Sequence, residues 1–151
     1  MNRNLADYLR RGDLNAGLAA IVDCPIPELR SELLEFAFES GSVVAYSFAH
    51  EIISLHNNWE SQYLASEVMA TALNHLQGAY LVALFHARQA LSLNPDDVGL
   101  WEYILLFHDI PEQLIGDDEA VQIAKRILTI KPDSVVARRV VGPTASGRGE
   151  S

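Results

Sequence analysis

The sequence predicts an all-α protein built from stacked helical hairpins. Apolar residues recur at helical spacing through most of the 151 residues, and no stretch alternates apolar and polar residues for long enough to predict a sheet. One helix ending is also repeated, because Ala90-Leu-Ser-Leu-Asn-Pro-Asp-Asp97 is echoed by Ile127-Leu-Thr-Ile-Lys-Pro-Asp-Ser134. The two prolines, Pro95 and Pro132, stand 37 residues apart. A fixed period of this length is typical of proteins in which each hairpin buries its apolar face against its neighbours.

Glycine, proline and capping residues set the expected helix ends. Gly12 ends the first helix and Asp13 caps the second, while Ser40-Gly41 ends the third and Ser42 caps the fourth. After Pro95, Asp96 or Asp97 caps the next helix. The predicted helices cover approximately residues 5–11, 14–22, 28–39, 43–55, 60–76, 79–93, 97–108, 120–128 and 135–141. We expect residues 1–141 to form a single helical-repeat domain and residues 142–151, which are small and polar, to form a disordered tail.

The second helices of three hairpins share one apolar pattern. Its four positions repeat at offsets of 38 and 37 residues, as Ala49, Ile52, Ile53, Leu55; Ala87, Ala90, Leu91, Leu93; and Ala124, Ile127, Leu128, Ile130. A shared pattern is expected when every second helix fits against equivalent neighbours.

Around Gly78 this pattern resembles a tetratricopeptide repeat. Gly78-Ala-Tyr80-Leu-Val-Ala83-Leu84 is similar to the family's G-x-Y-x-x-A-L opening of a second helix, and Ala87, Ala90-Leu91, Pro95 and Trp101 follow at the family's spacings. The resemblance covers residues 78–101 and implies a right-handed solenoid of about four hairpins. It also implies that the first helices of successive hairpins line a groove for a peptide or helix. Gly17 departs from the family, which has Ala at that position of the second helix.

Composition and charge exclude several classes of partner. Twenty acidic and eleven basic side chains give a net charge of −9, which repels a phosphate backbone, so we expect no nucleic-acid partner. The longest apolar stretches are far shorter than the ~20 residues that cross a bilayer, so we expect no membrane partner. The N-terminus does not resemble a signal peptide, and Cys24 is the only cysteine, so we expect a cytoplasmic protein.

The sequence carries no motif that names a reaction, a metal or a cofactor. His50-Glu51-Ile-Ile-Ser54 begins like the zinc-protease helix motif, but Ser54 stands where that motif needs its second histidine. Tyr46 and His50 are four residues apart, which predicts a hydrogen-bonded pair or a helix-surface contact. We therefore expect no catalytic residue, no metal and no cofactor.

Four glutamates form the strongest electrostatic feature. Glu28, Glu32, Glu35 and Glu39 recur at spacings that place them on one stripe of a helix. Such a stripe is usually a solvated face, and the alternative is recognition of a basic peptide or protein surface. If first helices line a groove, as the resemblance implies, the candidate binding residues are Glu32, Glu35, Glu39, Gln62, Glu67, Asn74, Trp101 and Glu102.

These observations favour a protein-interaction module, acting as an adaptor, inhibitor or immunity-type protein, over an enzyme. One alternative is a small all-α enzyme in which His50, His86 or His108 meets a carboxylate in a closed pocket. Another is a structural, self-associating module, which would show an apolar patch on a terminal hairpin and a symmetric dimer.

Overall fold

The computed structural model describes residues 4–147, and this part of the chain contains helices and no strands. No helix among these residues is both long and apolar enough to cross a membrane. Contacts between residues group the chain into two compact units, Met1–Leu93 (unit 1) and Asn94–Ser151 (unit 2), which we describe separately. Unit 1 contains α1 (Leu5–Arg10), α2 (Leu14–Ala20), α3 (Ile26–Ser40), α4 (Val44–Leu55), α5 (Trp59–Glu67), the π-helical turn η1 (Val68–Ala72) and α6 (Ala79–Leu93). Unit 2 contains α7 (Val98–Leu105), the 3-10 turn η2 (Leu106–His108), α8 (Asp117–Ile130) and α9 (Val135–Gly147).

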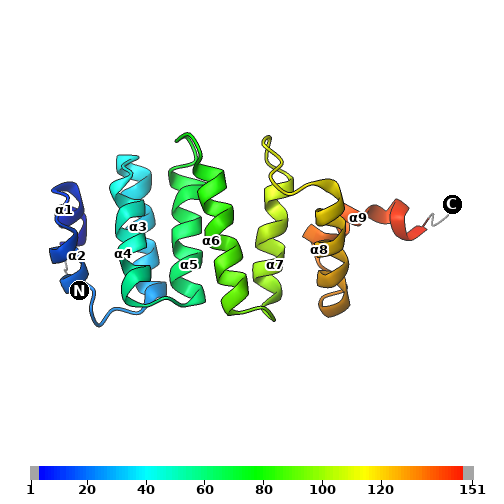
Figure 1. Ribbon diagram of the computed structural model, residues 1–151, viewed down its shortest axis with the longest axis horizontal. Helices are drawn as coiled ribbons and strands as arrows, with labels where there is room; N and C mark the ends of the chain where they lie inside the picture. Colours follow the sequence, from blue (N-terminus) through cyan, green and yellow to red (C-terminus); the bar gives the residue numbers. More distant parts are fainter. Residues whose placement is uncertain (1–3, 148–151) are drawn as a thin grey trace. The chain divides into compact units, whose positions relative to one another are not determined.

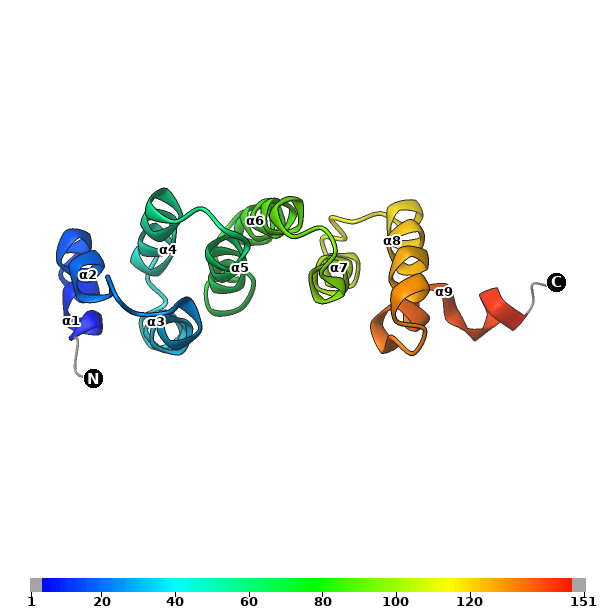
Figure 2. The same cartoon turned by 90° about the horizontal axis from the view of Figure 1, so that it is seen from below.

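The helices of unit 1 form two layers. Figure 2 shows α1, α3 and α5 along one side of the unit and α2, α4 and α6 along the other. Successive helices pack as the hairpins α1–α2, α3–α4 and α5–α6, and α3 also contacts α1, α5 and η1. Helices α3 to α6 alternate in direction, so α4 and α6 run the same way (Figure 1). In unit 2, α8 packs against α7 and α9, and α7 also contacts α9.

The capping aspartates predicted from the sequence are confirmed, but the predicted cap Ser42 is not the N-cap of α4. That position is Val43, and the Ser42 hydroxyl accepts the Val44 amide at 3.1 Å. The Asp13 carboxylate accepts the amide of Ala16 at 3.1 Å, and the Asp97 carboxylate accepts those of Gly99 and Leu100 at 2.8 and 3.3 Å, which selects Asp97 over Asp96. Gly41 has a φ of 62°, the left-handed conformation in which glycine ends a helix without a steric penalty.

The predicted fifth helix, residues 60–76, is wrong in its second half. The α-helix ends at Glu67, a π-helical turn covers Val68–Ala72, and Leu73 has left the helix. The Thr71 hydroxyl donates to the Glu67 carbonyl at 2.6 Å where the two helical geometries meet. At its other end α5 begins with a capping box between Asn58 and Ser61, a start signal that the sequence prediction missed.

The predicted domain limit at residue 141 lies inside α9. This helix is interrupted at Gly142, whose φ of 74° and ψ of 159° are not helical, and helical backbone then continues to Gly147. Residues 148–151 of the predicted tail lie outside the described residues. The single domain and the disordered tail therefore stay predictions, and the chain passes from unit 1 to unit 2 between Leu93 and Asn94.

The repeated apolar pattern corresponds to a repeated environment. Its first positions, Ala49, Ala87 and Ala124, are fully buried in α4, α6 and α8, and its second positions are also buried. Its last positions are exposed in every copy, at 60% for Leu55, 47% for Leu93 and 53% for Ile130. The three helices therefore use equivalent residues in equivalent ways, each within its own unit.

Close packing also explains why Gly17 replaces the expected alanine. A Cβ atom at Gly17 in α2 would lie 2.9 Å from the Phe48 ring and 3.4 Å from a Leu5 methyl group. Phe48 is fully buried in α4, so its ring has no free space to move into. The glycine allows α2 to approach α4 closely.

We predict that Gly17→Ala destabilises the protein by about 1–2 kcal/mol. The cost of overpacking, about 1–3 kcal/mol, exceeds the gain of up to about 1 kcal/mol in helix propensity. Urea unfolding of both proteins gives the difference. The matched control is the same change in a Phe48→Leu background, where the ring is absent and alanine should be neutral or stabilising. A stabilising Gly17→Ala in the wild-type background would contradict the packing argument.

Candidate functional site

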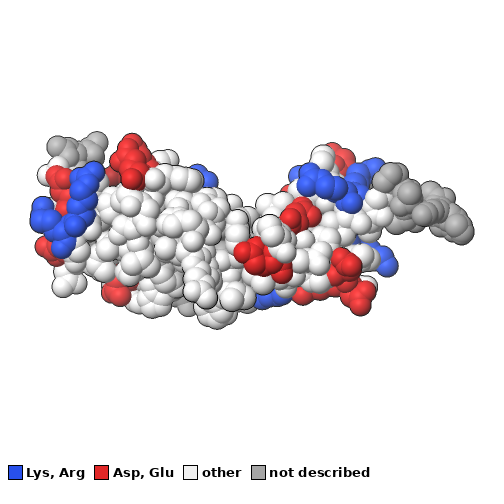
Figure 3. Space-filling model, turned by 90° about the horizontal axis from the view of Figure 1, so that it is seen from above, with Lys and Arg blue, Asp and Glu red and all other residues white. Residues whose placement is uncertain are grey.

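Three of the eight candidate binding residues gather at one pocket in unit 1. Glu32, Glu35 and Glu39 line it together with Phe36 of the same helix, α3, and with Ala6 and Arg10 of α1. The pocket has a volume of about 260 Å³. We call it the acidic pocket. In Figure 3 acidic and basic atoms lie near each other at the α1 end of unit 1, beside a broad uncharged area.

Among the described residues that line the acidic pocket, acidic side chains outnumber basic ones. Glu35 and Glu39 are exposed, and no other residue of 4–147 makes a hydrogen bond or ion pair with either carboxylate. Arg10, the one basic side chain among the lining residues that the structure describes, is held by Asp7 at 2.8 Å. Phe36 is 4% exposed and supplies an apolar wall. The pocket therefore combines negative charge with an apolar surface, and the sequence correctly grouped its three glutamates but did not predict α1 as the opposite wall.

Glu67 is occupied inside unit 1. Its carboxylate forms a two-pronged contact with Arg30 of α3, from Nε at 2.6 Å and from Nη2 at 2.8 Å. The hydrogen bond to Glu67 is the main reason that the pKa of Arg30 is raised, and the charge of the carboxylate adds to it while burial opposes it. Glu67 thus ties α5 to α3 and offers little to a partner.

Gln62 is likewise occupied, within a partly buried chain of hydrogen bonds. The Tyr46 hydroxyl lies 2.8 Å from His86 Nε2, His86 Nδ1 lies 2.7 Å from Gln62 Oε1, and Gln62 Nε2 donates to Asn57 at 3.0 Å. Since Gln62 Oε1 only accepts, Nδ1 carries the proton and Nε2 accepts from the tyrosine. Of the two alternatives predicted for Tyr46 and His50, the structure shows the helix-surface contact and not the hydrogen bond. Those two rings make only a surface contact, with centroids 6.2 Å apart, because the Tyr46 hydroxyl points to a residue 40 positions away.

Burial keeps His86 neutral. The side chain is 3% exposed, and desolvation, with a smaller contribution from nearby His50, lowers the pKa of His86 to about 4. Burial also raises the pKa of Tyr46, so its hydroxyl stays protonated and donates. Both nitrogens of His86 are used within the protein and neither meets a carboxylate. This arrangement is structural, since it joins α4, α5 and α6.

The remaining candidates are exposed or make local contacts. Asn74 is exposed and its amide donates to the Ala70 carbonyl and the Tyr80 hydroxyl, both at 3.3 Å. In unit 2 the Trp101 indole N–H donates to the Pro95 carbonyl at 2.8 Å, and the Arg126 guanidinium lies 4.7 Å from the ring centroid. Trp101 is thus half-buried and held in place.

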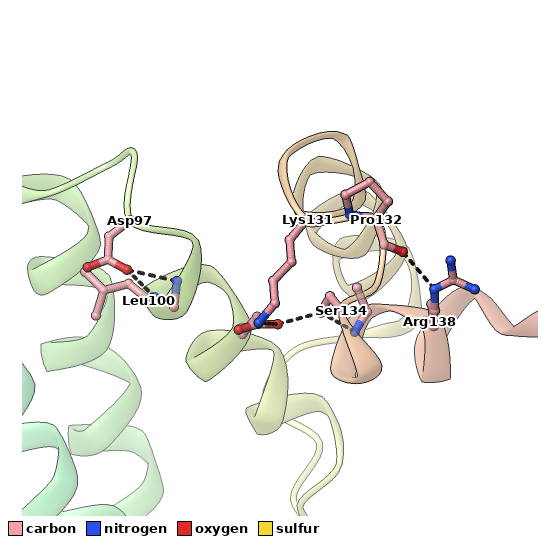
Figure 4. Close-up of polar contacts among 9 residues, drawn as sticks. Asp97, Leu100, Lys131, Pro132, Ser134 and Arg138 are labelled. Carbon is pink, nitrogen blue, oxygen red and sulfur yellow. Dashed lines mark hydrogen bonds and ion pairs between the residues drawn. The ribbon is translucent and has the colours of Figure 1, made fainter.

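Glu102 of α7 belongs to a cluster of polar side chains at the start of α9. The Ser134 hydroxyl donates to its carboxylate at 2.5 Å and also accepts the Ala137 amide at 3.2 Å, while the Lys131 ammonium lies 3.5 Å away. Figure 4 shows Lys131 and Ser134 converging on this carboxylate, with Arg138 turned to the Pro132 carbonyl nearby. Through its hydrogen bond with Ser134, Glu102 fixes the start of α9.

Among residues 4–147, His108 is the histidine that lies next to carboxylates. Its Nε2 lies 2.8 Å from Asp117 and its Nδ1 lies 3.6 Å from Asp109, and Nδ1 is buried without a hydrogen-bond partner. Because Nδ1 is buried, it is not accessible to a substrate. Among residues 4–147 no group of three or more His, Cys, Asp or Glu side chains could hold a metal ion.

A second pocket lies at the opposite ends of these hairpins and was not predicted. It is small, about 90 Å³, and mostly aliphatic, with the half-buried Cys24 and the exposed His56 among its lining residues. The Cys24 thiol donates weakly to the Pro25 carbonyl at 3.5 Å. This pocket lacks the charge that distinguishes the acidic pocket.

Comparison with known proteins identifies no relative: no family model, no curated protein and no solved structure matches the chain.

We predict that His86 makes the stability of the protein sensitive to acid. Its pKa is about 4 when folded and about 6.5 when unfolded, so protons favour the unfolded chain. The stabilisation from neutral His86 is complete above about pH 6.5 and is lost as the pH falls toward 4. His86→Gln removes this titration, so between pH 7 and pH 4 the wild type should lose about 2–3 kcal/mol more than the variant in urea unfolding. Equal losses would show that His86 titrates normally.

Proposed function

We propose that the protein is a protein-binding module whose acidic pocket receives a basic segment of its partner. One observation carries the proposal: three glutamates on one stripe of α3 line a single pocket with a phenyl wall. A like-charged stripe costs an isolated helix a few tenths of a kcal/mol per pair, and a cationic ligand offsets that cost.

The chemistry of the acidic pocket suits a lysine or arginine side chain. The charged head of such a side chain pairs with carboxylates, while its methylene stem lies on apolar surface such as Phe36 and Ala6. Exposed ion pairs contribute at most about 1 kcal/mol each, so a partner with several basic residues is needed for useful affinity. The net charge of −9 also accelerates encounter with such a partner.

We further propose that the hairpins form a tetratricopeptide-like right-handed stack. Two features support this fold: the motif from Gly78 to Trp101, and the equivalent burial of Ala49, Ala87 and Ala124. In such a fold the protein acts by occupying its partner, as an adaptor, inhibitor or immunity-type protein, and carries out no reaction. A single cysteine fits a reducing compartment such as the cytoplasm.

We predict that Glu35→Gln combined with Glu39→Gln weakens partner binding at least about tenfold. Removing two carboxylates from the acidic pocket removes much of its attraction for a cation while barely changing side-chain volume. Binding is measured first on arrays of 12-residue peptides with three or more lysines or arginines, and then by affinity capture with mass spectrometry. Peptides bound by the wild type should be released by the variant and by raised salt.

The matched control is Glu28→Gln combined with Glu112→Gln. It changes the net charge equally, and both residues are exposed and absent from the pocket lining. If both double variants weaken partner binding equally, the loss comes from the change in net charge, and the pocket is not a specific binding site. Equal retention of partners by the wild type and the pocket variant would refute the proposed function.

A further inference from the structure

Two arginines stand at the end of the helix that forms one wall of the acidic pocket. Arg10 is the last residue of α1 and lines the pocket, and Arg11 follows it as the residue that caps the helix. Figure 2 shows α1 and α3 along the same side of unit 1, and the two helices contact each other. An arginine that shares a pocket with several glutamates is expected to pair with them, because guanidinium and carboxylate groups form strong hydrogen bonds.

Both arginines are instead held by residues of α1. The Arg10 guanidinium donates to the Asp7 carboxylate at 2.8 Å, and the Arg11 guanidinium lies 5.3 Å from the centre of the Tyr8 ring. Each partner stands three residues earlier, which is a spacing at which side chains of one helix meet. Asp7 lies in the first turn of α1 and Arg10 in its last turn, so the helix dipole favours both charges.

The contact with Asp7 leaves two carboxylates of the pocket without a cation. Glu35 and Glu39 are exposed, and neither carboxylate pairs with another residue of 4–147, although Arg10 lines the same pocket. One guanidinium therefore has two possible partners, Asp7 along α1 or a glutamate across the pocket. The side chains of Arg10 and Asp7 are 57% and 59% exposed, and exposed ion pairs are weak, so the choice between the two partners is finely balanced.

We propose that Asp7 is a positioning residue that keeps the acidic pocket open by holding Arg10 away from Glu35 and Glu39. Without the Asp7 carboxylate, the Arg10 guanidinium moves to the glutamates and competes with the basic side chain of the partner. The inference rests on the proposed function, since it explains how the same pocket stays available to a cation. The position of Arg10 sets the fraction of molecules with an open pocket, and the apparent affinity falls in proportion to that fraction.

The first test is a double-mutant cycle on the full chain, with a peptide of alternating lysine and glycine as the probe. Isothermal titration calorimetry at low salt gives the dissociation constants. Asp7→Asn should raise the dissociation constant about two- to fivefold, because an exposed ion pair within the pocket must break before the peptide binds. Arg10→Gln removes the competitor and should bind at least as tightly as the wild type. In the Arg10→Gln background, Asp7→Asn should have no such effect, because no guanidinium is released.

Two control variants make the same changes of charge outside the pocket. Asp23→Asn removes an exposed carboxylate of unit 1, and Arg11→Gln removes the arginine next to Arg10, and neither residue lines the pocket. Asp7→Glu keeps the carboxylate and should bind the peptide like the wild type. Far-ultraviolet circular dichroism checks that every variant is folded. If Asp7→Asn weakens binding equally in both backgrounds, or no more than Asp23→Asn does, its effect is structural or one of net charge, and the proposal is overturned.

The second test needs no ligand. In a crystal structure of the Asp7→Asn variant, the Arg10 guanidinium should lie within ion-pair distance of Glu35 or Glu39. A guanidinium that stays at position 7 or turns to solvent overturns the proposal. The two proposals can therefore fail separately. A wild type that does not bind the peptide refutes the proposed function, whereas the position of Arg10 in the variant decides the role of Asp7 whatever the peptide does.

Discussion

The enclosure of α5 is the constraint on which unit 1 depends. Ser61, Gln62 and all residues from Leu64 to Met69 are buried, so this helix has almost no face toward solvent. Its polar groups must therefore find partners inside the protein, because a buried polar group without a hydrogen bond costs several kcal/mol. Each partner comes from a neighbouring element: the Ser61 hydroxyl donates to the His56 carbonyl after α4, the Ser66 hydroxyl to a carbonyl of α6, and Glu67 accepts from Arg30 of α3. Apolar packing brings these helices together, and the hydrogen bonds fix their register.

The same enclosure decides which surfaces remain for a partner. Since α5 lies inside, its side chains cannot form the floor of an open groove, and binding surfaces fall on the helices around it. The two sides of α3 have different roles. Arg30 reaches inward to Glu67, whereas Glu35 and Glu39 face the pocket shared with α1. On the other layer, His86 uses both ring nitrogens internally while its neighbour Phe85 is exposed. One helix thus supplies both a structural contact and an exposed apolar surface.

Local signals in the sequence predicted the helix ends, whereas long-range contacts decided the site. Asp13, Gly41 and Asp97 act on backbone groups within four residues, so spacing alone was enough to find them. Gln62 and Glu67 looked like surface residues because polar side chains usually are, but their partners lie 24 and 37 positions away. One signal was present, since residues 61–87 contain a single charged side chain. A run that is so poor in charge indicates a buried helix, and it would have removed Gln62 and Glu67 from the predicted site while leaving the glutamates of α3.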